Sequence, residues 1–170
     1  MINDNIIIRD AVIINRNFEG KAEKPYNPQG KRTFTVLLDE ETANLLQKDG
    51  WNVKIKPDQN DPDAPARGYL SVTVNFNGSL APIIMQITRK NGKIKRTPMK
   101  EDYVSLIDTA EIKNVKLEIK PYNWSLPSGQ TGVRAYLKTM YYELVEDIFA
   151  SEYDEYGDDI DLSDTIPFEE

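Results

Sequence analysis

The stretch Tyr69–Phe76 reads YLSVTVNF and decides the fold class. Its apolar and polar residues alternate with a period of two, which is the pattern of a β-strand with one buried face. The alternation predicts a strand that directs one set of side chains inward, Leu70, Val72, Val74 and Phe76, and another set outward, Tyr69, Ser71 and Thr73.

Similar stretches lie on both sides of this strand, and turn residues separate them. Asn27-Pro28-Gln29-Gly30 has Pro and Gly where a type I turn favours them. Asn91-Gly92 is the strongest short signal for a hairpin, and Asp58–Arg67 and Ser125–Gly132 have the composition of loops. We therefore expect further strands at Ile6–Ile14, Arg32–Leu38, Trp51–Lys56, Ile83–Arg89, Lys93–Arg96, Ile112–Lys120 and Val133–Val145.

Two short segments favour helix instead. Asp39 can cap a helix over Glu40–Lys48, because acidic residues fill its first turn and Gly50 follows its end. Val104–Asp108 is long enough for about one further turn. Together the elements predict one antiparallel β domain with one or two short helices, arranged as a small barrel.

The composition excludes much ordinary enzyme chemistry. The 170 residues are 39% hydrophobic and 29% charged, as in a folded soluble protein. They include no Cys and no His, which excludes disulfides, thiolate zinc sites, thiol nucleophiles and imidazole bases. No apolar run approaches 18 residues, so we expect neither a membrane span nor a signal peptide. We also expect no metal and no cofactor.

The formal charge of −7 is unevenly distributed along the chain. Residues 146–170 contain eleven carboxylates and no Lys or Arg, so the rest of the chain carries a net charge of +4. This polarity points to nucleic acid as a partner of the body. We expect a folded domain over residues 1–146 and a disordered acidic tail over 147–170, because the tail combines low hydrophobicity with high charge. The tail either docks a partner through its final Ile-Pro-Phe or only keeps the protein soluble.

The segment Arg89–Arg96 contains five bases and no acid. If its turn has two residues, Lys90 faces Lys93 across the hairpin, and like charges opposite one another are destabilising. Either the hairpin contacts phosphates, or its lysines protect a solvated edge strand from aggregation.

The final strand shows a more specific pattern, in which Arg134, Tyr136 and Lys138 share one face. Alternating bases and rings suit single-stranded nucleic acid, because cations follow the phosphates and rings stack on bases. The same combination recurs at Arg32 and Phe34, and at Lys120, Tyr122 and Trp124.

Trp51 is predicted to lie in the core, because it shares its face with Val53 and Ile55. Glu111-Ile112-Lys113 and Glu118-Ile119-Lys120 match half of a metal-dependent nuclease signature, but such a short pattern is common by chance in a charged strand. We therefore expect no enzymatic activity.

The body contains the motifs RNFEG at Arg16–Gly20, RTFTV at Arg32–Val36, GWNVK at Gly50–Lys54 and AYLKTMY at Ala135–Tyr141, and the tail ends in the acidic stretch Asp158–Phe168 with its Ile-Pro-Phe. The body motifs are similar to those of a bacteriophage group of single-stranded DNA-binding proteins, and the tail stretch resembles the acidic C-terminal peptide of bacterial single-stranded DNA-binding proteins. The resemblance implies a five-stranded OB-fold that coats single-stranded DNA without sequence preference in phage replication, recombination or repair.

The tail resemblance implies recruitment of replication and recombination proteins and competition with DNA. Bacterial tails end on their Phe, whereas Glu169 and Glu170 follow Phe168 in this chain. The tail residues that would bind partners are Asp158, Asp159, Asp161, Asp164, Ile166, Pro167 and Phe168.

The residues predicted to bind DNA fall into two groups. Phosphate contacts are expected from Arg16, Arg32, Lys54, Arg89, Lys93, Lys95, Arg96, Arg134 and Lys138, and base stacking from Phe34, Tyr69, Tyr122, Trp124 and Tyr136.

Two other classes of function fit the same features. One is a β-rich structural or adaptor protein whose acidic tail docks a partner, and the other is an acidic mimic of DNA. The resemblance favours the DNA-binding function and places the protein in the cytoplasm of an infected bacterium.

Overall fold

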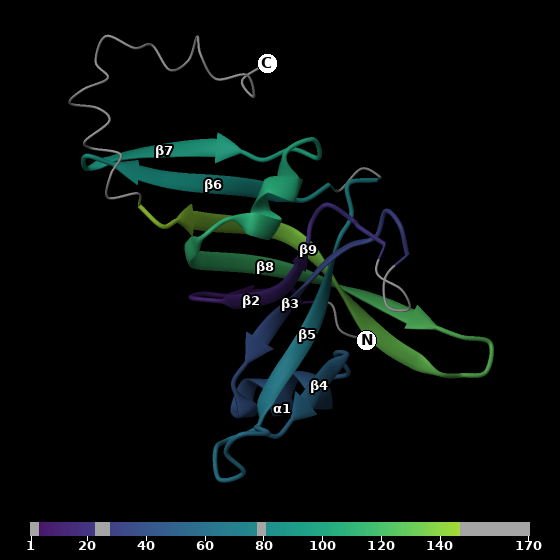
Figure 1. The fold of residues 1–170 in the computed structure, drawn as a ribbon. Helices are drawn as coiled ribbons and strands as arrows, with labels where there is room; N and C mark the ends of the chain where they lie inside the picture. The colour runs from purple at the N-terminus through teal and green to yellow at the C-terminus, as the bar shows by residue number, and fades with distance from the viewer. Residues whose placement is uncertain (1–3, 23–27, 78–80, 147–170) are drawn as a thin grey trace, which may run out of the picture.

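The computed structural model describes residues 4–22, 28–77 and 81–146 (Figure 1). Most of them lie in one sheet of nine strands, with one α-helix and one 3-10 helix outside it. The strands are β1 (Ile6–Ile8), β2 (Val12–Asn17), β3 (Arg32–Leu38), β4 (Val53–Lys56), β5 (Arg67–Val74), β6 (Ile83–Lys90), β7 (Lys93–Pro98), β8 (Ile112–Ser125) and β9 (Thr131–Leu144); the helices are α1 (Glu40–Lys48) and η1 (Val104–Thr109).

The main path of the sheet runs β1-β8-β9-β5-β3-β2. β1 and β2 do not pair with one another, but only three residues separate them, and Asp10 among these has a positive φ of 51°. The backbone N–H of Ala11 donates to the Val115 carbonyl at 2.9 Å, which ties this connection to β8. The path therefore begins and ends on one bent stretch of chain, and the strand expected over Ile6–Ile14 is divided at the bend.

The mainly β, OB-like fold with two short helices is confirmed, but the sheet is not closed into the predicted barrel, because β1 and β2 do not pair. The bent β1–β2 stretch, β3, β5, β8 and β9 make the five-membered path, while β4, β6 and β7 are additions to it. The sheet is not purely antiparallel, because β9 runs parallel to both β5 and β6. β6 lies beyond β5 along the same edge of β9, and the β6–β7 hairpin extends from there (Figure 1).

The core lies on the inner face of this sheet. The rings of Phe18 and Phe34 stack with centroids 5.2 Å apart and are almost completely buried. The predicted inward residues Leu70, Val72 and Val74 are buried, and so is Trp51, as expected. Phe76 is half-buried at the margin of the core.

Helix α1 has the predicted bounds, because its caps are encoded locally. The Asp39 carboxylate accepts the Thr42 N–H at 2.7 Å, and this bond lowers the pKa of Asp39. Gly50 follows the helix with a φ of 103°, a conformation that favours glycine. The helix packs closely on β5, since a Cβ at Gly68 would lie 2.3 Å from the Ala43 Cβ. Neither helix of the described part of the chain is long enough to cross a membrane.

β8 and β9 extend further than predicted, and the expected loop Ser125–Gly132 is correspondingly shorter. Their ends form an arm that projects away from the rest of the sheet (Figure 1). The pairing of Ser125 with Thr131 continues the ladder into residues whose composition suggested a loop. Residues 147–170, which include the predicted tail, lie outside the described residues.

Candidate nucleic-acid interface

The strand register places many of the predicted residues on one continuous surface. Lys54 of β4 lies opposite Tyr69 of β5, and Thr73 of β5 lies opposite Tyr136 of β9. Tyr136 in turn lies opposite Lys120 of β8. We call this surface the outer face; it comprises the outward residues Thr33, Thr35, Leu37, Lys54, Lys56, Arg67, Tyr69, Ser71, Thr73, Lys120, Tyr122, Arg134 and Tyr136.

The outer face has three aromatic residues, Tyr69, Tyr122 and Tyr136. Tyr122 and Tyr136 meet edge to face with centroids 5.7 Å apart, and Tyr122 is 53% exposed. Tyr69 is half-buried, and the Lys56 Nζ lies 5.6 Å from its ring centroid. Tyr69 and Thr73 are four residues apart on β5, which is about 13 Å along a strand. The face is therefore long enough for several nucleotides.

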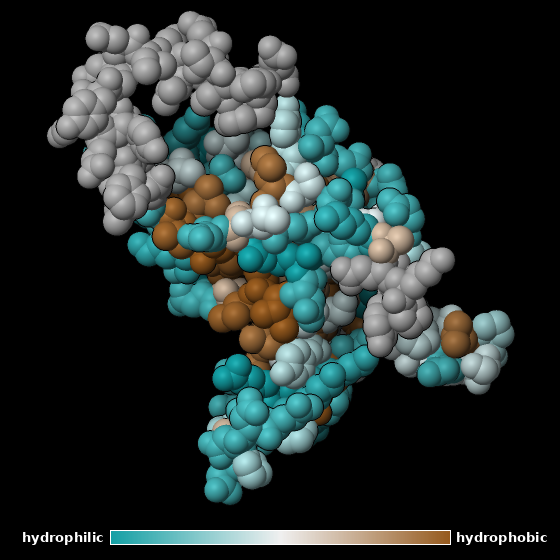
Figure 2. Space-filling model, viewed as in Figure 1, coloured by the Kyte–Doolittle hydropathy of each residue, from teal (hydrophilic) through white to brown (hydrophobic). Residues whose placement is uncertain are grey.

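The charge of the outer face is uniformly positive. Its thirteen positions include five bases, Lys54, Lys56, Arg67, Lys120 and Arg134, and no carboxylate. In the space-filling view, the end of the molecule formed by α1, β4 and β5 is mainly hydrophilic (Figure 2). Bases beside exposed rings are the combination that binds single strands, because the rings stack while the bases neutralise phosphates.

Lys138 lies at the margin of this face. Its Nζ is 3.6 Å from the Glu118 Oε2, at the point where a bulge shifts the β8–β9 register. The Asn5 amide donates to the same carboxylate at 3.2 Å, and this bond, together with Lys138, lowers the pKa of Glu118. Lys138 is therefore partly neutralised within the protein, while its side chain remains exposed.

The β6–β7 hairpin forms a second basic region. Lys90 lies opposite Lys93, as the two-residue turn predicted, and both turn residues, Asn91 and Gly92, have positive φ. Its exposed side chains include Lys93, Lys95 and Arg96, but no aromatic residue lies among them. The hairpin can attract phosphates but offers no ring for a base.

The fourth predicted hairpin contact, Arg89, has a partner within the protein. Arg89 donates through Nε to the Glu143 carboxylate at 3.0 Å, and the Lys113 Nζ lies 3.8 Å from the same oxygen. The Glu143 side chain is 10% exposed, so this cluster joins the hairpin to the end of β9. Arg89 is half-exposed and contributes less positive charge to a ligand than its neighbours do.

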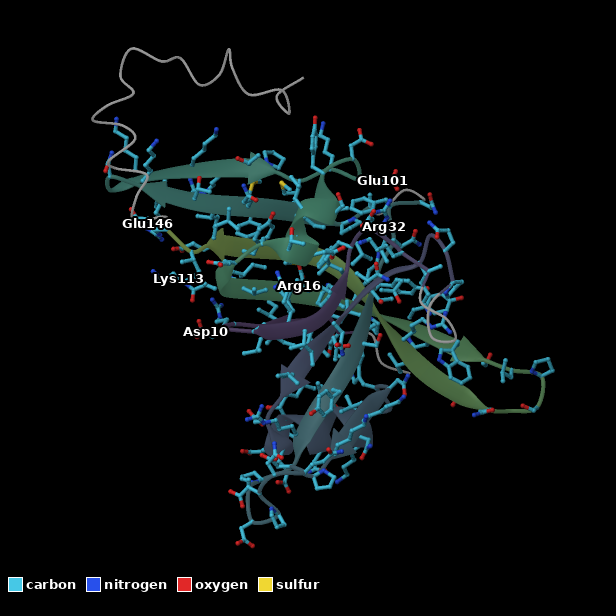
Figure 3. The ribbon with its side chains drawn as sticks, viewed as in Figure 1. Asp10, Arg16, Arg32, Glu101, Lys113 and Glu146 are labelled. Carbon is cyan, nitrogen blue, oxygen red and sulfur yellow. The ribbon has the colours of Figure 1, made fainter. Side chains whose placement is uncertain are left out.

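Three predicted contacts are corrected by their positions. Phe34 is 1% exposed and stacks on Phe18, so its ring cannot reach a base. Arg16 donates to the carbonyls of Ile107 and Ala110 at 2.7 and 2.8 Å, and it thereby holds the C-terminal end of η1 on β2 (Figure 3).

Arg32 is the third. It donates to the Phe18 carbonyl at 2.5 Å, and it lies 3.5 Å from a Glu101 carboxylate oxygen, as the labelled side chains show (Figure 3). Its guanidinium also lies 5.5 Å from the Phe76 ring centroid. The motif that contains Arg32 and Phe34 therefore belongs to the core and its margin and not to the outer face.

Three bases of the outer face were not predicted as contacts. Lys56 lies on the same face of its strand as Lys54, and Lys120 on the same face as Tyr122. The two-residue alternation of the sequence could therefore have predicted both as contacts. Arg67 was assigned to a loop, and only its pairing with Lys56 reveals it as the first residue of β5. The tail residues 158–168 lie outside the described residues, so their predicted roles remain predictions.

Trp124 lies beyond Tyr122 on the projecting arm. It is half-buried, and its indole ring covers the backbone of Gly132, where an added Cβ would lie 2.4 Å from Cζ2. An open cleft of about 730 Å³ separates this part of the arm from the end of α1 at Lys48, Asp49 and Gly50.

A model of a known family matches most of the chain. The family model described as "Putative phage ssDNA-binding domain" matches residues 1–164. No curated protein matches the chain.

Two of the similar solved structures come from bacteriophage Enc34. The single-stranded DNA-binding protein of bacteriophage Enc34 in complex with ssDNA has 12% identity and a TM-score of 0.52, covering 84% of this chain and 88% of that one. Its C-terminal truncation has 11% identity and a TM-score of 0.50, covering 84% and 87%. At this identity the likeness concerns the fold.

Proposed function

The chain belongs to this phage ssDNA-binding domain family, and from that premise we propose that its outer face binds and coats single-stranded DNA during phage DNA replication or recombination. The observation that supports the proposal most strongly is the register of β4, β5, β9 and β8. It joins three exposed or half-exposed tyrosines to five bases on one surface without an acid.

The energetics of this surface fit strand coating. Each base stacked on an aromatic side chain contributes roughly 1–3 kcal/mol, and neutralised phosphates add a salt-dependent contribution through counterion release. Tyr69, Tyr122 and Tyr136 supply the rings, and neighbouring lysines and arginines supply the charge. Neither contribution depends on base identity, so the protein coats strands with weak sequence preference.

The β6–β7 hairpin is the electrostatic extension of this site. Its exposed bases draw the phosphate backbone beyond the outer face, and they act at longer range than the rings do. Lys93 and Lys95 are the principal groups, because Arg89 is already paired with Glu143.

The remaining parts of the proposal concern the tail and the cell. The acidic tail competes with DNA for the basic body and recruits replication and recombination proteins through Ile166, Pro167 and Phe168. The protein is not an enzyme, and it acts in the cytoplasm of the infected bacterium. The sequence of the tail and the family of the chain support these statements.

Binding of a fluorescent oligothymidine to the full chain at several salt concentrations tests the central proposal. We expect tight binding with a log–log salt slope of about −3 to −6, which corresponds to roughly four to eight neutralised phosphates at about 0.7 each. Duplex DNA of equal length should bind weakly, because its bases are not available for stacking. Equal affinity for duplex and single strand would rule out the stacking surface, and no binding at low salt would favour an adaptor or a DNA mimic.

A further inference from the structure

We infer that the cleft between the β8–β9 arm and the end of α1 is a base-reading pocket, which stacks one nucleobase on Trp124 and favours bases with an exocyclic amino group over thymine or uracil. The inference rests on the proposed function, and it adds one position of chemical preference to a surface that is otherwise tolerant of sequence.

The indole of Trp124 is a preformed stacking surface. One side of the ring lies on Gly132, where any larger residue would collide with it, since an added Cβ would lie 2.4 Å from Cζ2 and 2.7 Å from Cε2. Gly132 is opposite Trp124 in the β8–β9 ladder, so the strand register holds the ring in place. A ring fixed in this way loses little entropy when a base stacks on it.

The cleft is continuous with the outer face. Trp124 and Tyr122 are two residues apart on β8 and share a phase, so their Cα atoms are about 6.6 Å apart. That spacing suits neighbouring bases of an extended strand. The volume of about 730 Å³ is within the range of sites that hold a small ligand, and it exceeds what one planar base requires.

The chemistry of the opposite wall favours hydrogen-bond donors. Lys48, Asp49 and Gly50 line it at the C-terminal end of α1, where the helix dipole presents partial negative charge. The Asp49 carboxylate adds a full negative charge, and Lys48 is the only cation in the lining. A phosphate is therefore disfavoured beside Asp49, whereas an amino group of cytosine, adenine or guanine can donate to it.

The side chain of Asp49 can be changed without removing the hydrogen bonds that end α1. The capping bonds at this end of α1 use its backbone N–H, which donates to the carbonyls of Leu45 and Gln47. Asp49→Asn keeps the size of the residue and that N–H, and it removes the charge that accepts from the base. The variant therefore tests the base preference without removing a helix cap.

The experiment measures the affinity of the full chain for oligodeoxycytidine and oligodeoxyuridine of about 12 nucleotides, a length within the range that one OB-fold occupies. The two bases have nearly the same shape, but only cytosine has an amino group. We expect the wild-type chain to bind oligodeoxycytidine about threefold to tenfold more tightly, as for one added hydrogen bond to a charged acceptor at a solvent-accessible site.

The variants identify the source of any preference. Asp49→Asn should abolish it, whereas Glu41→Gln, which removes an equal charge from the first turn of α1, should preserve it. Trp124→Ala should weaken binding of both oligonucleotides at least fivefold.

Two results would overturn the inference: equal affinities in the wild type, or unchanged affinities in Trp124→Ala. Failure of the wild-type chain to bind either oligonucleotide would instead refute the proposed function.

Discussion

The outer face and the β6–β7 hairpin are both basic, but they hold their charges in different surroundings. On the outer face, bases alternate with rings, as in the pairing of Lys54 with Tyr69. On the hairpin, Lys93 and Lys95 lie two residues apart on β7 and have no aromatic neighbour on the hairpin. The two regions therefore bind a nucleic acid in different ways. Stacking is little affected by salt and requires unpaired bases, whereas attraction by charge alone is weakened by salt and acts on paired and unpaired strands alike.

The largest expected effect tests the assignment of the faces themselves. Phe34→Ala should lower the free energy of unfolding by about 3–5 kcal/mol, because it removes a fully buried ring that stacks on Phe18. Urea denaturation measures this change. The adjacent Thr35→Ala, on the outer face, should change stability by no more than about 0.5 kcal/mol. If Phe34→Ala remained stable but no longer bound DNA, the inner and outer faces of β3 would be reversed.

The sequence of β3 does not show clearly which of its two faces is buried. The alternation in Tyr69–Phe76 predicts strand and phase together, because its polar and apolar residues separate cleanly. Arg32–Leu38 has Thr on one phase and Phe, Val and Leu on the other, and the proximity of Arg32 to Phe34 suggested a binding pair. The structure shows both residues engaged in packing, with Arg32 bound to the Phe18 carbonyl and to Glu101.

Long-range pairing explains the other differences. Helix α1 was predicted correctly because Asp39 and Gly50 mark its ends locally. The parallel contacts of β9 with β5 and β6, and the role of Arg16 as an anchor for η1, join residues far apart in the sequence. No local pattern contains that information, whereas the two-residue turn at Asn91-Gly92 was readable because its chemistry is local.

The next effect concerns the rings of the outer face. Tyr136→Ala should weaken binding of oligothymidine by roughly 1–3 kcal/mol and leave the salt slope unchanged, because it removes a stacking surface but no charge. Tyr103→Ala is the matched control, since Tyr103 is an exposed tyrosine that precedes η1 and belongs to no strand. Equal weakening in the two variants would show that Tyr136 is not a specific contact.

The hairpin should respond in the opposite way. The double substitution Lys93→Ala and Lys95→Ala should flatten the log–log salt slope by about 1.4, because each phosphate that is no longer neutralised reduces the slope by about 0.7. Affinity should fall at low salt and approach that of the wild type at high salt. Lys100→Ala, which removes an exposed base outside the hairpin, should leave the slope unchanged. A weakening of affinity that persisted at high salt would indicate direct recognition by the hairpin rather than charge alone.

The smallest expected effect concerns the acidic tail, which could compete for either region. Deletion of residues 147–170 should raise affinity for a short oligonucleotide about threefold to tenfold at low salt. The deleted segment contains ten carboxylates, and a segment tethered to its own domain has an effective concentration in the millimolar range. The increase should shrink as salt rises, because screening weakens the competing charges.

Combining this deletion with the earlier variants shows which region the tail occupies. The last described residue, Glu146, follows the end of β9, and β6 pairs with β9 up to Glu143. The described chain therefore ends close to β6, and the carboxylates of the tail are opposite in charge to the bases of the hairpin. We expect the increase in affinity on deletion to disappear in the Lys93→Ala, Lys95→Ala background and to persist in Tyr136→Ala, a coupling that a double-mutant cycle measures. An increase that survived removal of the hairpin charges would place the tail on the outer face instead.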